Sequence, residues 1–211
     1  MPSIIIYESK NVKANGLDHN NQIDQNKLKE YFFEDDFEAL SHLNNFKIPF
    51  NQENLTLLYP GSGADIFLPL IYLQKLFPQI KGANLTFVDL DDNLGIIKTI
   101  LDQVGISFSQ EEKNKISFYW ENKLINLTFI TKKIEHFWEE QPSFDIYFER
   151  AFRLMRDHLH NYEEKVYQKL NQNGILISDS GFLGLNLTYL DVPKNLSSYG
   201  EMVIGIKKEK K

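Results

Sequence analysis

Hydrophobic residues along this chain fall into short apolar runs that alternate with longer amphipathic segments. Strands buried in a parallel sheet are short and apolar nearly throughout, whereas surface helices place apolar residues three or four positions apart. The strand pattern occurs at residues 55–59, 85–89, 144–148 and 175–178. The helix pattern occurs at residues 66–77, 94–101 and 155–170. Strands that alternate with helices predict a mostly parallel sheet with helices on both faces, a three-layer α/β/α sandwich.

Two segments alternate with a period of two instead, which is typical of antiparallel strands. Residues 115–131 have this pattern on both sides of a turn at residues 121–123, so we expect a β-hairpin there. Near the end of the chain, the runs at residues 187–190 and 202–206 predict an antiparallel hairpin at the edge of the sheet. Asn173 and Gly174 are expected to stop the preceding helix with a left-handed residue.

Residues 1–50 differ from the rest of the chain in their pattern of apolar and polar residues. Residues 1–8 resemble an edge strand, and residues 9–22 are polar, so we expect a mobile loop there. Apolar residues then recur every three to five positions from Ile23 to Leu40, which predicts one amphipathic helix over residues 23–43. We therefore expect a strand, a loop and a helical cap over residues 1–50 and the α/β domain over residues 51–211.

Composition excludes several classes of function. The chain has 211 residues, which at roughly 150 residues per domain fits one compact domain with an appendage. Its net charge of −6 offers no basic surface for nucleic acid, and the lack of cysteine excludes a thiolate nucleophile and a cysteine-ligated zinc site. No run reaches the roughly 18 apolar residues of a membrane helix. The start has no basic flank, so we expect a cytoplasmic protein whose partner is a small molecule rather than nucleic acid or a membrane.

The residues just after the first two predicted central strands suggest a ligand. In an open parallel sheet, ligands bind outside the carboxyl ends of the strands. Gly61 and Gly63 follow the first strand, where glycine permits a sharp turn and a close approach to the backbone. Asp89 ends the second strand, 26 positions after Gly63, near the roughly 20 expected when an acid binds ribose hydroxyls. These residues predict a pocket for a nucleoside.

The segment from Leu55 to Ile177 resembles the class I S-adenosylmethionine-dependent methyltransferases. The similar stretches are residues 55–65, 87–89, 144–149 and 170–176. The resemblance implies a Rossmann-like sheet and S-adenosylmethionine as cofactor. It also implies that Gly61 and Gly63 lie against the methionyl part, that Asp89 holds the ribose, and that Glu149 contacts the cofactor or the acceptor.

The sequence departs from the family at three places. The family has an acid where this chain has Tyr59 and often has a third glycine where this chain has Asp65. Asp65 either contacts the cofactor ammonium in place of that acid or caps the helix that follows. The chain after Ser178 is also too short for the family's last helix together with a hairpin. A nicotinamide dinucleotide is disfavoured, because its fingerprint needs a third glycine where this chain has Ile66.

Methyl transfer is an in-line displacement in which a protein mainly aligns donor and acceptor, so few residues need chemical roles. Glu149 and Arg150 are the candidates for moving a proton, although they are equally compatible with a structural ion pair. His158 and His160 are two positions apart on a predicted helix and do not face each other, so no metal site is expected. The sequence favours a methyltransferase acting on a small molecule or a protein side chain. The alternative is an inactive binding or scaffold protein with the same fold.

Overall fold

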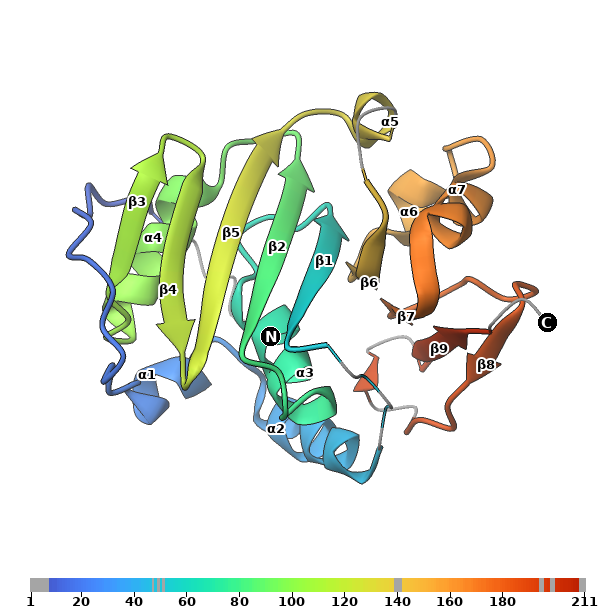
Figure 1. The fold of residues 1–211 in the computed structure, drawn as a ribbon, viewed down its shortest axis with the longest axis horizontal. Coiled ribbons are helices and arrows are strands. Elements are labelled where there is room, and N and C mark those ends of the chain that lie inside the picture. The colour runs from blue at the N-terminus through green and yellow to red at the C-terminus, as the bar shows by residue number, and fades with distance from the viewer. Residues whose placement is uncertain are drawn as a thin grey trace.

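The computed structural model describes residues 8–46, 48, 50, 52–138, 142–193, 196, 197 and 200–208. Within these ranges it contains one sheet in the order β3-β4-β5-β2-β1-β6-β7-β9-β8 (Figure 1). The strands are β1 (Asn54–Pro60), β2 (Gly82–Asp89), β3 (Phe108–Glu112), β4 (Lys115–Trp120), β5 (Lys123–Thr131), β6 (Phe144–Glu149), β7 (Leu170–Ser178), β8 (Leu187–Tyr189) and β9 (Val203–Lys207). The helices are α1 (Gln25–Lys29), α2 (Glu34–Ser41), η1 (His42–Asn45), α3 (Phe67–Leu76), α4 (Leu94–Gln103), α5 (Ile134–Phe137), α6 (Arg153–Arg156) and α7 (Tyr162–Lys169).

The centre of the sheet is parallel and Rossmann-like, as predicted. β5, β2, β1, β6 and β7 are parallel neighbours in that order. This is the doubly wound arrangement, in which the chain moves outward from β1 to one side and then returns to build the other side. The reversal falls between β1 and β6, so a ligand site is expected at the carboxyl ends of these two strands.

Both edges of the sheet are antiparallel. The predicted hairpin of residues 115–131 is present as β4 and β5, and β3 extends it by one further strand. The pattern did not predict β3, because Phe108 is its only large apolar residue. The predicted C-terminal hairpin is present as β8 and β9, with β9 between β7 and β8. Residues 179–186, between β7 and β8, contain no helix, in agreement with the shortened end inferred from the sequence.

Two hydrophobic clusters cover the two faces of the sheet. Alternate residues of β1 point to opposite faces, so Leu57 and Tyr59 belong to the cluster with α3 and α4, whereas Leu58 belongs to the cluster with α5 and α7. The three layers expected from the sequence are therefore present. None of the helices in the described ranges combines the length and the apolar character that crossing a bilayer requires.

Two predicted helices are shorter in the structure than the sequence suggested. The helix expected over residues 23–43 is divided into α1, α2 and η1. Tyr31, Phe32 and Phe33 interrupt it, because three consecutive aromatic side chains cannot all lie on one helix face. The helix expected over residues 155–170 is divided into α6 and α7 by Asn161, which is left-handed with φ 53°.

The expected helix stop at Asn173 and Gly174 is wrong in its position. α7 already ends at Lys169, and both residues belong to β7. Asn173 supplies the left-handed residue, with φ 60°. The apolar residues after position 169 serve a strand rather than a last helical turn.

Residues 8–24 contain no helix or strand, but they contact the sheet and α4. The backbone N–H groups of Asn15 and Gly16 both donate to the carbonyl of Phe108 at 3.1 Å. The N–H of Lys10 donates to Thr99 at 2.9 Å, and the ring of His19 stacks on Tyr119. The edge strand predicted for residues 1–8 falls, apart from Glu8, outside the described residues.

Candidate functional site

The turn after β1 depends on two left-handed glycines. Gly61 has φ 62° and Gly63 has φ 52°, a region that other residues adopt only with strain. The N–H of Gly61 donates to the carbonyl of Val88 at 2.8 Å, which ties the turn to the end of β2. A Cβ atom at Gly61 would overlap the ring of Phe152, whereas one at Gly63 would meet nothing within 4 Å. Gly61 therefore serves close packing, and Gly63 leaves open space.

Asp89 lies beside this turn, as the sequence predicted. One carboxylate oxygen accepts the N–H of Gly63 at 2.7 Å, and the other accepts the N–H of Leu90 at 2.7 Å. The oxygen that accepts from Leu90 also accepts the N–H of Asp91 at 3.3 Å, so of about four lone-pair positions on a carboxylate the free one is on the oxygen bound to Gly63. The hydrogen bond between Gly63 and Asp89 holds the carboxyl ends of β1 and β2 in one site.

A cavity of about 370 Å³ opens at Asp89, and we name it the Asp89 pocket. It is lined by residues from the ends of β1, β2 and β5 and from the segment around α6: Gly61, Val88, Asp89, Leu90, Lys132, Lys133, Ile134, Glu135, Phe152, Met155, His158 and Leu159. Leu90 and Ile134 give the pocket apolar walls next to the Asp89 carboxylate. Lys132, Lys133 and Glu135 add charged groups to the lining, and the combination of apolar walls with a carboxylate at a strand end is what a nucleoside site requires.

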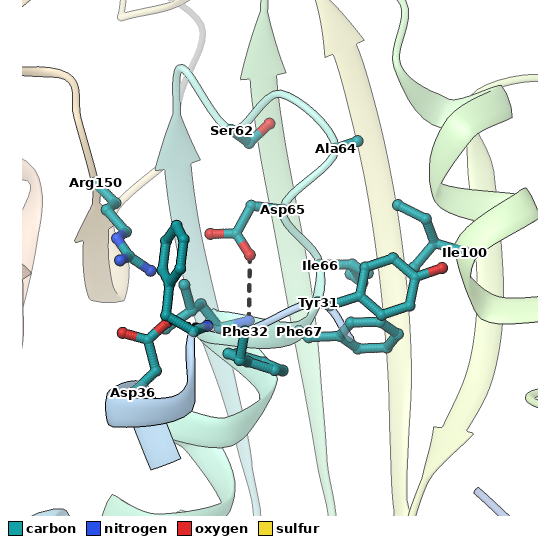
Figure 2. A pocket seen from close by; sticks show the side chains of 12 residues that line it. Tyr31, Phe32, Asp36, Ser62, Ala64, Asp65, Ile66, Phe67, Ile100 and Arg150 are labelled. Carbon is teal, nitrogen blue, oxygen red and sulfur yellow. Dashed lines mark hydrogen bonds between the residues drawn. The ribbon is translucent and has the colours of Figure 1, made fainter. Parts of the chain in front are cut away.

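A second cavity, of about 340 Å³, lies beside the same turn, and we name it the Arg150 pocket (Figure 2). Its lining comes from the segment between α1 and α2, from the turn and α3, and from the end of β6: Tyr31, Phe32, Phe33, Asp36, Ser62, Ala64, Asp65, Ile66, Phe67, Leu68, Ile100 and Arg150. Gly61 lines the Asp89 pocket, and the next residue, Ser62, lines the Arg150 pocket. The glycine turn therefore stands between the two cavities and borders both.

Asp65 is anchored from both sides within the Arg150 pocket. One oxygen accepts the N–H of Leu68 at 3.2 Å in the first turn of α3, and the other accepts the hydroxyl of Tyr59 at 2.9 Å. Burial raises the pKa of Asp65, against the opposing influence of the Arg150 charge and the Tyr59 hydrogen bond. Asp65 thus does cap the helix, and its carboxylate still lines the pocket. Its contact with a cofactor ammonium stays a prediction.

Glu149 and Arg150 do not pair with each other. The carboxylate of Glu149 pairs with Arg156 and accepts hydrogen bonds from Ser178 and Tyr147, each at 2.6 Å. The ion pair of Glu149 with Arg150 considered from the sequence is therefore wrong: Arg156 of α6 is the partner, because strand neighbours point to opposite faces. Burial raises the pKa of Glu149 to about 7 despite these three donors.

Glu149 is 1% exposed and lines neither the Asp89 pocket nor the Arg150 pocket. Its predicted contact with cofactor or acceptor receives no support from this placement. Arg150, by contrast, is half-buried and lines the pocket that carries its name. A guanidinium stays protonated at any physiological pH, so Arg150 is a binding group rather than a base.

Several lining residues were not found from the sequence. Phe152 and Met155 follow β6, and Lys132 follows β5, so the rule that strand ends carry the ligand site would have included them. Tyr31 and Phe33 fall within the single helix expected over residues 23–43, and the break between α1 and α2 brings them to the pocket. His158 lines the Asp89 pocket, and no group of metal-ligating side chains occurs in the described ranges.

No protein-family model and no curated protein sequence matches the chain. Solved structures do match it at low identity. A methyltransferase from Geobacter sulfurreducens is 13% identical, with 89% of this chain and 98% of that chain covered at a TM-score of 0.45. A precorrin-6y C5,15-methyltransferase from Geobacter metallireducens is 14% identical, with 82% and 87% covered at a TM-score of 0.44.

Likeness at this level does not assign an activity to the chain. The order and directions of the strands settle the architecture independently of any relative. The chain has a Rossmann-like α/β/α fold with an antiparallel C-terminal edge hairpin.

Proposed function

We propose that the chain is an S-adenosylmethionine-dependent methyltransferase that binds the nucleoside of its cofactor in the Asp89 pocket. The observation that carries the proposal is the hydrogen bond from the Gly63 N–H to Asp89. It places a carboxylate with spare acceptor capacity beside an open glycine turn, at the point of the sheet where α/β proteins bind nucleosides. The sequence resemblance to class I methyltransferases supports the same assignment.

The residues of the Asp89 pocket fit the parts of this cofactor. Asp89 would accept a ribose hydroxyl on the oxygen that also holds the Gly63 N–H, and the side chains of Leu90 and Ile134 would offer apolar contact to a base. Gly63 leaves space over the turn for an extended amino-acid arm, since no atom lies within 4 Å of the position of a Cβ. The arm would then run along residues 61–65, toward the Arg150 pocket.

When bound, S-adenosylmethionine would supply a methyl group on a sulfonium: the acceptor would bond to the methyl carbon as the carbon–sulfur bond breaks in line, with its electron pair left on the neutral sulfur. The chain contributes alignment, which supplies roughly 7–11 kcal/mol of such a barrier. The Arg150 pocket, on the other side of the turn, is the place for the acceptor. Asp65 lines that pocket and burial raises its pKa, so in this proposal Asp65 would take up a proton from an acceptor that has to lose one.

Isothermal titration calorimetry with S-adenosylhomocysteine tests the proposal. We expect the wild-type chain to bind and Asp89→Ala to lose about 1.5–3 kcal/mol of binding free energy, the range for hydrogen bonds to a charged group. Asp91→Ala is the matched control, because Asp91 is an exposed carboxylate two positions away that lines neither pocket. Absence of binding to folded wild-type protein refutes the proposal.

The alternative of an inactive binding or scaffold protein predicts a different outcome. Binding of S-adenosylhomocysteine would persist, but no methyl group would pass from S-adenosylmethionine to any acceptor. The two-cavity arrangement favours the enzyme, because a protein that only binds the cofactor has no need of a second cavity at the glycine turn. We propose a small molecule rather than a protein side chain as the acceptor, because the Arg150 pocket has a volume of only about 340 Å³.

A further inference from the structure

The Arg150 pocket contains two carboxylates and one guanidinium, and the hydrogen-bonding needs of these groups differ. Asp65 already receives the Tyr59 hydroxyl and the Leu68 N–H. Asp36 receives the N–H of Phe33 at 3.1 Å. Among the described residues, Arg150 forms no hydrogen bond and no ion pair within 4.0 Å. Arg150, with five N–H donors, and the second oxygen of Asp36 are therefore the polar groups of this pocket that keep hydrogen-bonding capacity among the described residues.

The guanidinium of Arg150 points into the cavity, where a ligand could accept its hydrogen bonds. Figure 2 shows its guanidinium extending from the end of β6 into the cavity, on the side where Asp36 and Asp65 also face. The charge of Arg150 acts on Asp65, but neither carboxylate forms an ion pair with it within 4.0 Å, so the guanidinium has room for a ligand group. A planar guanidinium binds carboxylates in a bidentate manner, which makes an anionic group the best complement.

The aromatic side chains that line the rest of the Arg150 pocket indicate the shape of the ligand that it would bind. Four aromatic side chains line the cavity: Tyr31, Phe32, Phe33 and Phe67. The ring of Tyr31 packs edge-on against Phe67 at 5.1 Å, so this wall is fixed. Phe33 is 62% exposed, which is unusual for so large an apolar side chain and leaves it available to cover a ligand at the rim. Aromatic walls complement a flat or apolar body.

We propose that the Arg150 pocket binds the methyl acceptor and that the acceptor is a small organic acid with a flat apolar body. Its carboxylate pairs with Arg150, and its body lies against the aromatic side chains between α1 and α2. This inference rests on the proposed function for the identity of the reaction, but not for the binding of the acid. Arg150 is then the residue that distinguishes acids from neutral molecules of the same shape.

The probes are 4-hydroxybenzoate and 4-hydroxybenzamide, which have the same shape and differ in charge. Binding is measured by ligand-observed NMR titration and by calorimetry, with S-adenosylhomocysteine present. We expect the wild-type chain to bind the acid at least about tenfold more tightly than the amide, a ratio that corresponds to one good charge pairing. In Arg150→Gln the acid should lose about tenfold in affinity and the amide should not change, so that the preference disappears.

Three further measurements keep the inference falsifiable. Arg150→Lys retains the charge and should retain part of the preference for the acid. Arg153→Gln is the control, because Arg153 of α6 pairs with Glu201 at 2.5 Å and lines neither cavity. Circular dichroism and thermal unfolding establish that each variant is folded before its affinity is compared.

The outcomes separate this inference from the proposed function. If S-adenosylhomocysteine binds but the acid and the amide bind equally or not at all, the acceptor class is wrong and the cofactor assignment stands. If Arg150→Gln weakens S-adenosylhomocysteine as much as the acid, Arg150 holds the cofactor carboxylate and the inference is overturned. If S-adenosylhomocysteine does not bind to the folded protein, the proposed function is refuted, and with it the assignment of the acid as a methyl acceptor.

Discussion

Replacement of Gly61 by alanine tests the packing that joins the glycine turn to α6. Two costs arise at this position. The left-handed backbone, at φ 62°, costs an alanine about 1–2 kcal/mol. The added Cβ overlaps Cδ2 of Phe152 and stands 2.9 Å from Cε2, so the buried ring has to shift. Overpacking of this kind costs a further 1–3 kcal/mol or so, about 2–5 kcal/mol in total.

Gly63→Ala separates these two costs. Gly63 has nearly the same backbone conformation, with φ 52°, but no atom lies within 4 Å of its hypothetical Cβ. Gly63→Ala should therefore lower the free energy of unfolding by the conformational cost alone, about 1–2 kcal/mol. The N–H that donates to Asp89 is retained in the alanine variant. The difference between the two variants is the cost of displacing Phe152, about 1–3 kcal/mol.

Equilibrium urea unfolding, followed by far-ultraviolet circular dichroism, measures both free energies, provided that the slope against denaturant is the same in all variants. Phe152→Leu introduced into the Gly61→Ala background should recover part of the loss, because the smaller side chain makes room for the methyl group. Equal destabilisation by Gly61→Ala and Gly63→Ala would refute the reasoning. It would mean that the ring does not limit the space above the turn.

The other predictions concern buried polar groups. Because the pKa of Glu149 is about 7 in the folded chain against an ordinary 4.5, the folded state binds more protons between these values. The free energy of unfolding should therefore fall as the pH rises from about 5 to about 7, and Glu149→Gln should remove that part of the slope in urea titrations at several pH values. Arg156→Leu leaves Glu149 buried without its cation and should cost about 3–5 kcal/mol, with a smaller loss when combined with Glu149→Gln; an equal or larger loss in the double variant contradicts a paired role. Tyr59→Phe removes the hydroxyl bonded to Asp65 and should cost about 1.5–3 kcal/mol in the same assay, whereas an unchanged midpoint would show that this bond is not formed in solution.

Much of the fold was predictable because its central strands are buried on both faces. The runs at residues 55–59, 85–89, 144–148 and 175–178 lie in β1, β2, β6 and β7 and are mostly apolar, and such runs have few alternatives to a parallel sheet. The strand β3 was not predictable, because most of its residues are polar and only its pairing with β4 makes it a strand. The predicted helix boundaries were wrong where a single left-handed residue sets them, as Asn161 does before α7.

The candidate site was predictable in its backbone and not in its side-chain partners. The spacing of Gly63 and Asp89 predicted that they share a site, and a hydrogen bond now joins them. The partner of Glu149 was not predictable, because Arg150 is its sequence neighbour but points to the other face, and Arg156 is reached only after the chain turns into α6. Sequence distance carries little information about such pairs once a strand ends.

Tyr59 explains how the chain manages without an acid at the end of β1. Its ring is buried between Phe87 and Phe148, and its hydroxyl reaches the carboxylate of Asp65, six positions later. Burial raises the pKa of the Tyr59 hydroxyl, so it stays protonated and can only donate toward Asp65. The carboxylate is therefore held in place by the strand and by α3, while Arg150 has no hydrogen-bond or ion-pair partner within 4.0 Å among the described residues. The proposed acceptor would set its anionic group against Arg150 and its reacting group toward Asp65, one of the two carboxylates that line the pocket.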